Sequence, residues 1–84
     1  MNIREKIVEI DEDILLLDNF DLAIIGIYKK PYEPIVAVYD KEKCIKIIME
    51  KYSLNYHLAT EYFNFNILEA CFNSESPLFI TLLD

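Results

Sequence analysis

The stretch "PIVAVYDKEKCIKIIMEKY", Pro34 to Tyr52, decides the fold because its hydrophobic period changes at Asp40. Before Asp40, the β-branched residues of "IVAV" are typical of a strand. After it, the apolar residues form one broad stripe of an amphipathic helix: Cys44, Ile45, Ile47, Ile48 and Tyr52. An aspartate can end a strand and cap a helix, so the sequence predicts a strand followed by a helix over residues 41–52.

A second strand is predicted upstream in "DLAIIGIY", residues 21–28. The loop "KKPYEP" separates it from the strand at 35–39, and two prolines among polar residues are typical of a loop. An antiparallel hairpin, 21–28 with 35–39, is the simplest topology. Gly26 lies inside the first strand, where a glycine marks a bulge or a close approach to the backbone. We expect a helix to pack closely over it, in preference to a ligand.

The N-terminal segment predicts a short helix over residues 3–10. Asn2 is a suitable cap, and Ile3, Ile7 and Ile10 have helical spacing. "DED", residues 11–13, indicates an acidic turn. The apolar run 14–17 is too short for a helix, and both a short strand and a buried connector fit it.

The C-terminal segment predicts a helix over 56–66 and a last strand over 78–82. "NSESP" between them has the composition of a loop. Residues 66–73 fit helical and alternating periods equally well, so both alternatives stay open. In "EYFNFN", residues 61–66, we expect the aromatic side chains to fill the core.

Together these elements predict an α+β fold in a single domain, residues 1–84. A small antiparallel sheet, made by the hairpin and the strand at 78–82, would pack against the helices at 3–10, 41–52 and 56–66. A chain of 84 residues hides only roughly 60 to 65% of its unfolded surface, so its stability is marginal. A homodimer would bury more surface.

The composition excludes several functions. A net charge of −7 repels phosphate backbones and anionic lipid, so direct binding to nucleic acid or membranes is not expected. Cys44 and Cys71 lie in apolar runs, and with one histidine they make a poor zinc set. The first residues lack the apolar stretch of a signal peptide, and no apolar run approaches 18 residues. The sequence therefore predicts a cytoplasmic protein with reduced thiols.

No sequence motif indicates catalysis, a metal or a cofactor. A P-loop, a dinucleotide fingerprint and a nucleophile elbow are all missing. The acidic run 11–21 lacks the spacing and central glycine of a calcium loop, and a solvated edge explains it better. We expect His57 on the surface, and the lysines of 41–51 on the solvated side of their helix.

Six polar residues at the ends of elements are the candidate binding residues. Carboxylates and tyrosines there could line a pocket at the rim of the sheet. The alternative is that each one caps a helix or holds a turn. The candidates are Asp21, Tyr39, Asp40, Glu61, Tyr62 and Asn66.

Three stretches resemble a group of small phage and prophage proteins of unknown function. They are "FDLAIIGI", "VYDKEKCIKIIMEKYSLNYHLATEYFNFN" and "SPLFI", which together cover most of residues 20–80. By position the resemblance selects the six candidates together with Gly26, Phe63 and Phe65. It implies a phage or mobile-element origin and expression inside a bacterial host cell.

The chain departs from that group at two places. His57 and Leu58 replace acidic residues that open the last helix, while Glu69 and Asn73 lie near positions of glycine. Glycines there would imply a strand and a turn after Asn66.

These observations predict a non-enzymatic protein that binds a host or phage protein, with inhibition or modulation of a host system as one form of that role. The alternative is a module that binds a small molecule or a nucleotide at the rim of the sheet.

Overall fold

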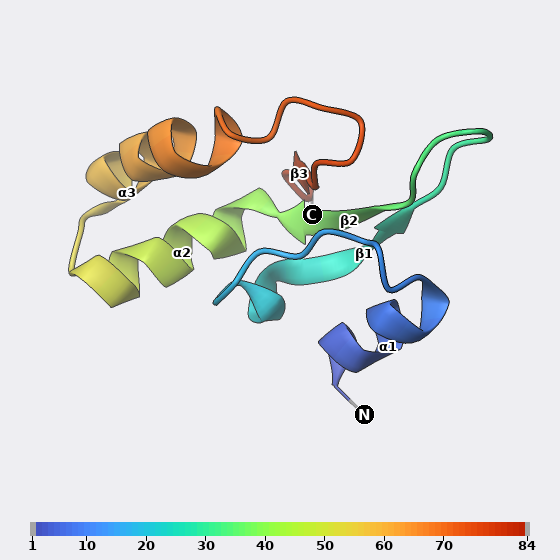
Figure 1. Cartoon of the computed structure of the whole chain (residues 1–84). Coiled ribbons are helices and arrows are strands. Elements are labelled where there is room, and N and C mark those ends of the chain that lie inside the picture. Colours follow the sequence, from blue (N-terminus) through green and yellow to red (C-terminus); the bar gives the residue numbers. More distant parts are fainter. Residues whose placement is uncertain (1, 84) are drawn as a thin grey trace.

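The computed structural model describes residues 2–83, which form helices and a small sheet (Figure 1). The elements in chain order are α1 (Ile3–Ile10), β1 (Ile24–Tyr28), β2 (Val36–Asp40), α2 (Lys41–Tyr52), α3 (Tyr56–Phe63) and β3 (Leu78–Ile80). A 3-10 turn, Asp21–Ala23, precedes β1, and a π-helical turn, Asn64–Leu68, continues α3. The α+β class is confirmed.

The change from strand to helix occurs at Asp40, as predicted. Its Oδ1 accepts hydrogen bonds from the backbone N–H groups of Glu42 at 3.0 Å and Lys43 at 3.3 Å. These bonds satisfy two of the donors that the start of α2 leaves without a partner. At the other end, Ser53 adopts a left-handed conformation, φ 53°, and stops the helix. In the same way, Asn2 Oδ1 accepts from Glu5 N at 2.9 Å and caps α1.

Replacing Asp40 by alanine is expected to lower the free energy of unfolding by about 1 kcal/mol, since this is the usual cost of losing an N-cap. Urea unfolding measures the change. Asp40→Asn is the matched control, because asparagine caps as well as aspartate. An equal loss in both variants would show that the carboxylate has a role other than capping.

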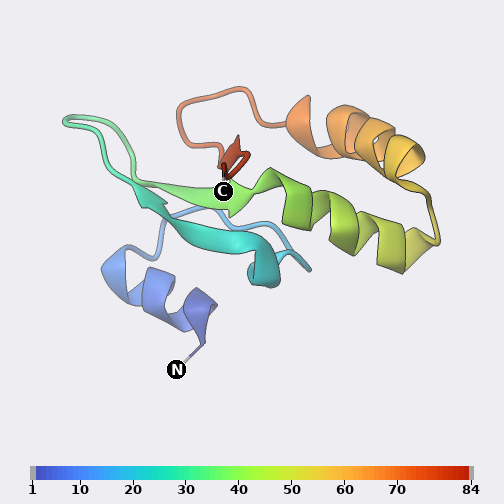
Figure 2. The same ribbon diagram turned by 180° about the vertical axis from the view of Figure 1, so that it is seen from behind.

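The sheet has the order β1-β2-β3 and is mixed, so the prediction of an antiparallel sheet is wrong for its last strand. β1 and β2 form the expected antiparallel hairpin, whereas β3 runs parallel to β2. The reason is the connection: α2 and α3 both lie between β2 and β3, and a helical crossover returns the chain in the same direction. Figure 2 shows α2 and α3 beside each other at one end of the sheet.

Gly26 marks a bulge in β1. The register shifts between Ile24, which pairs with Tyr39, and Gly26, which pairs with Val38. A Cβ atom added to Gly26 would meet nothing within 4 Å. The expectation that a helix packs closely over this glycine is therefore wrong. The predicted adjacency of the two strands is confirmed.

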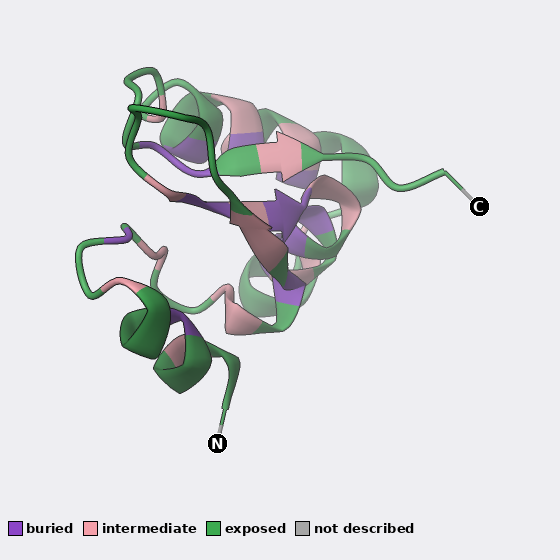
Figure 3. Ribbon diagram, turned by 90° about the vertical axis from the view of Figure 1, so that its right-hand side faces the viewer, coloured by how far each residue is buried: buried purple, intermediate pink, exposed green. Residues whose placement is uncertain are grey.

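The core lies on one face of the sheet, where Ala37 and Tyr39 are fully buried. The Tyr39 hydroxyl accepts a hydrogen bond from the Leu17 N–H at 2.9 Å, which holds the segment before β1 against this face. Residues 14–17 are thus the connector alternative, with Ile14 buried. Figure 3 shows the buried residues gathered along β2 and the sides of the helices that face it.

The aromatic run in "EYFNFN" divides between core and surface. Phe63 is fully buried and meets Phe79 of β3 edge to face, with ring centroids 5.0 Å apart. Phe65 is 68% exposed, so its predicted place in the core is wrong. Beyond Asn66, the chain completes the π-helical turn, in which Ile67 is buried, and then leaves helical order. Helical structure therefore continues to Leu68, and residues 69–73 form neither a helix nor a strand.

Candidate binding pocket

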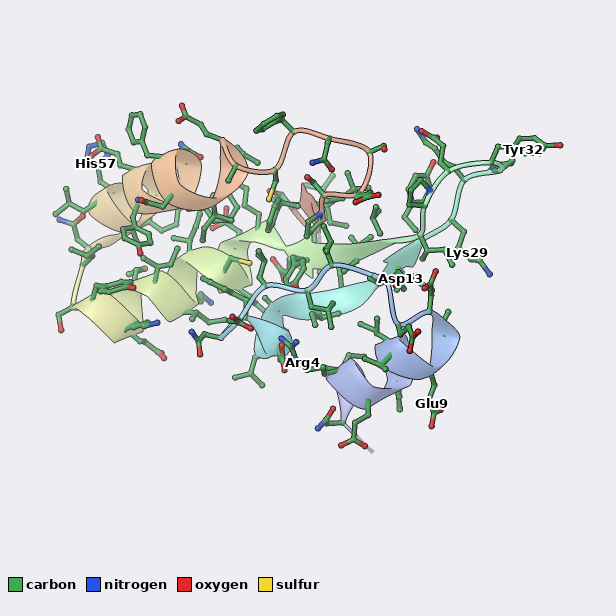
Figure 4. The ribbon with its side chains drawn as sticks, in the orientation of Figure 1. Arg4, Glu9, Asp13, Lys29, Tyr32 and His57 are labelled. Carbon is green, nitrogen blue, oxygen red and sulfur yellow. The ribbon has the colours of Figure 1, made fainter. Side chains whose placement is uncertain are left out.

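Three of the six candidate residues hold the fold together. Asp21 receives two hydrogen bonds from the Arg4 guanidinium, at 2.8 and 3.0 Å, and these bonds lower the pKa of the Asp21 carboxyl. Figure 4 shows Arg4 beside the segment before β1. Tyr39 and Asp40 are buried. The Tyr39 hydroxyl binds the connector at Leu17, and the Asp40 carboxylate caps α2. These three residues therefore follow the alternative given above, in which a candidate residue holds the local structure and does not bind a ligand.

Glu61 lies on the exposed side of α3. Its Oε1 is 3.2 Å from Nε2 of His57, one helical turn earlier, and both side chains are more than half exposed. His57 is thus a surface residue, as predicted (Figure 4). Glu61 does not line the pocket described next.

Tyr62 and Asn66 lie together at a pocket of about 190 Å³ between α2 and the end of α3. Asn19 and Phe20, which precede the 3-10 turn, contribute from a third segment. The lining residues are Asn19, Phe20, Ile47, Ile48, Lys51, Tyr52, Tyr62, Asn66 and Ile67. Polar groups thus surround an apolar floor, which is the usual arrangement of a binding site.

Two tyrosines form one wall of this pocket. The Tyr62 hydroxyl donates to the Tyr52 hydroxyl at 3.1 Å, and the ring centroids are 4.9 Å apart. This bond lowers the pKa of Tyr52 and raises the pKa of Tyr62. Lys51 Nζ lies 5.5 Å from the centre of the Tyr52 ring. The wall therefore offers a flat aromatic surface, two hydroxyl groups and a cation.

The π-helical turn supplies a further part of the lining. Its wider turn carries both Asn66 and Ile67 to the pocket, and π-helical turns are frequent at functional sites. Asn66 Nδ2 donates to the backbone oxygen of Tyr62 at 3.0 Å, which orients its amide. Asn19 reaches the rim from a residue with φ 72°, a conformation that asparagine tolerates well. Amides can both donate to a ligand and accept from it.

Two other hollows are weaker sites. One of about 730 Å³ is open and lies over Arg4, Asp18 and Asp21, of which Arg4 and Asp21 already pair with each other. One of about 150 Å³ lies between the hairpin and the loop before β3. In residues 2–83, no three His, Cys, Asp or Glu side chains are arranged to hold a metal ion.

The sequence interpretation missed most of the pocket. The sequence predicts Lys51 and Tyr52 only as a solvated and an apolar residue of the helix over 41–52, and it indicates no site at Asn19 or Phe20. One signal was present: Tyr52 is the last apolar residue of its stripe, at the end of α2 nearest to the following helix.

Comparison with known proteins gives no family model, no curated protein and no solved structure that matches the chain. None of the helices within residues 2–83 has the length and apolar character needed to span a bilayer.

Proposed function

We propose that this protein is a small acidic module that binds another protein, and that the pocket between α2 and α3 receives one side chain of that partner. The size of the pocket carries the proposal. A cavity of about 150 Å³ accommodates benzene, and sites for drug-sized ligands occupy roughly 300 to 1,000 Å³. At about 190 Å³, this pocket fits one aromatic or branched aliphatic side chain. Protein interfaces commonly anchor on such a residue.

The net charge of the chain indicates the charge of the partner's surface. Residues 53–84 contain no lysine or arginine, but they contain four acidic residues, Glu61, Glu69, Glu75 and Asp84. With a net charge of −7, the chain attracts a basic partner and repels nucleic acid. The partner we propose thus presents an apolar anchor on a surface with a net positive charge. A phage or mobile-element origin, with a bacterial host protein as the target, would agree with the resemblance described above.

The size of the pocket is tested with side-chain analogues. Toluene, p-cresol and indole, titrated into isotope-labelled protein, are expected to shift the NMR signals of Ile47, Ile48 and Ile67. Tyr62→Ala removes a wall and should weaken these shifts. Tyr56→Ala is the control, because Tyr56 lies on the same helix, bonds to Glu42 at 2.9 Å and is outside the pocket. Shifts that are equal in both variants would contradict the pocket.

Binding to a protein is tested with tagged wild type and the same two variants in bacterial lysate. A partner is expected to be retained by wild type and Tyr56→Ala and lost from Tyr62→Ala. Failure to retain any protein above background at several salt concentrations would contradict the proposal. Thermal shift against metabolites and nucleotides tests the alternative, because a ligand that binds only the folded state raises the melting temperature.

A further inference from the structure

One face of the sheet is apolar and is partly exposed on its two edge strands. Paired residues of neighbouring strands point to the same face, so the register defines its members. We call this the outer face: Gly26, Tyr28, Val36, Val38, Leu78 and Ile80. On the central strand β2, Val36 is buried, at 6% exposed, and Val38 is half-buried. Tyr28, Leu78 and Ile80 are 44, 42 and 41% exposed.

This arrangement is unusual for a sheet that borders on water. Such sheets alternate apolar residues toward the core with polar residues toward solvent. Here the core face carries Ala37 and Tyr39, and the opposite face carries Val36 and Val38, so β2 is apolar on both sides. A strand that is apolar on both sides is typical of a sheet covered on both faces.

The outer face also has little charge. Asp40 follows Val38 on the same side, but it is buried and bonded to the start of α2. The nearest exposed charges, Lys30 and Glu33, lie at the hairpin end and pair with each other at 3.7 Å. A basic partner would therefore find no free carboxylate on this face, whereas an identical neutral face could pack on it without bringing carboxylates together.

The exposed area agrees with a missing partner. A monomer of 9.9 kDa is expected to expose about 5,200 Å², whereas this chain exposes 5963 Å². The excess, about 760 Å², is close to the ~800 Å² that each partner buries in a standard interface. The radius of gyration is 13.1 Å, where about 12 Å is expected for this length.

We infer that the outer face is the interface of a homodimer, in which two sheets stack face to face about a twofold axis. Stacked sheets lie about 10 Å apart, and Gly26 of the edge strand β1, which has no side chain, allows close approach beside Val38 of the central strand. A twofold arrangement uses the same patch on both copies. The pocket between α2 and α3 is lined by none of these residues, so the dimer leaves it accessible.

Gly26→Lys tests this interface with little disturbance of the single chain, because a Cβ atom there meets nothing within 4 Å. Sedimentation equilibrium should give 19.8 kDa for wild type, twice the 9.9 kDa of one chain. The lysine would be buried without a partner, so the dimer dissociation constant should rise by roughly a hundredfold. The substitution lowers the net negative charge, so repulsion between copies cannot explain the loss.

Two control variants isolate the effect of the charge. Tyr32→Lys makes the same change of charge at the tip of the hairpin, which Figure 4 shows projecting away from the sheet, and should leave the dimer intact. Gly26→Ala adds only the Cβ atom and should also leave it intact. If Gly26→Lys does not fold, Ile80→Lys replaces it on the other edge strand, β3. A monomeric wild type, or a dimer that persists in the folded lysine variant, would overturn the inference.

A mixed sample of labelled and unlabelled wild type gives a readout independent of any variant. Intermolecular NOEs are expected from the methyl groups of Val38, Leu78 and Ile80. Intermolecular NOEs confined to other residues would place the interface elsewhere and overturn this assignment.

Discussion

Phe63→Ala should lower the free energy of unfolding by about 3 to 5 kcal/mol, the range found for buried phenylalanines. Phe63 is fully buried and joins α3 to the sheet through the ring of Phe79. Lys41 Nζ lies 5.9 Å from the centre of its ring and adds to this contact. Truncation leaves a cavity between α3 and β3. Because a chain of this length has few other large buried side chains, the loss should be a large fraction of the total stability.

Phe65→Ala is the matched control, two residues further along the same segment. Its ring is 68% exposed, so the expected change is within about 0.5 kcal/mol, as for most surface substitutions. Urea unfolding, monitored by far-UV circular dichroism, measures both variants. Equal losses would show that Phe65 is covered in solution by a partner or a second copy. A loss below about 1 kcal/mol for Phe63→Ala would contradict its place in the core.

Alkaline pH should destabilise the protein through Cys44. Burial raises the pKa of its thiol from 9.0 to about 12. Below pH 9 the thiol is protonated in both the folded and the unfolded chain. Between pH 9 and 12 only the unfolded chain loses the proton, so the free energy of unfolding falls as the pH rises. At about 1.4 kcal/mol per pH unit, the loss approaches ~4 kcal/mol at pH 12.

Cys44→Ala removes this contribution and should therefore show a shallower decline of stability above pH 9. The variant loses some packing at every pH, so the comparison is between slopes and not between absolute values. Burial raises the pKa of the Tyr39 hydroxyl in the same direction, and its contribution, present in both proteins, begins near pH 10. Equal slopes in wild type and variant would show that the Cys44 thiol is accessible to solvent.

The candidate site was predictable only in part. Tyr62 and Asn66 were selected because they lie at the end of a helix beside apolar residues, and the structure places both at the pocket. Asp40 has the same sequence signature, but its carboxylate is used by its own helix. From sequence, a polar residue that caps cannot be distinguished from one that binds, because the difference depends on where the neighbouring N–H groups point.

Phe65 and β3, for which the prediction is wrong, show the same limit of what sequence can reveal. Phe63 and Phe65 have the same chemistry and lie two positions apart, yet only Phe63 is buried. The sequence predicts that a short last strand pairs with the hairpin in an antiparallel sheet. β3 does pair with the hairpin strand β2, but it runs parallel to β2. In both examples a contact with a distant part of the chain decides the outcome.

The sequence by itself determined the type and order of the elements: two capped helices, a hairpin, and the change from strand to helix at Asp40. Each follows from residues within a few positions of one another, where the period of apolar residues and the capping side chains act directly. Only the tertiary structure decided the direction of β3, the pocket formed by three separate segments, and the apolar outer face of the sheet. These depend on which distant residues meet, because burial is set by the packing of whole elements.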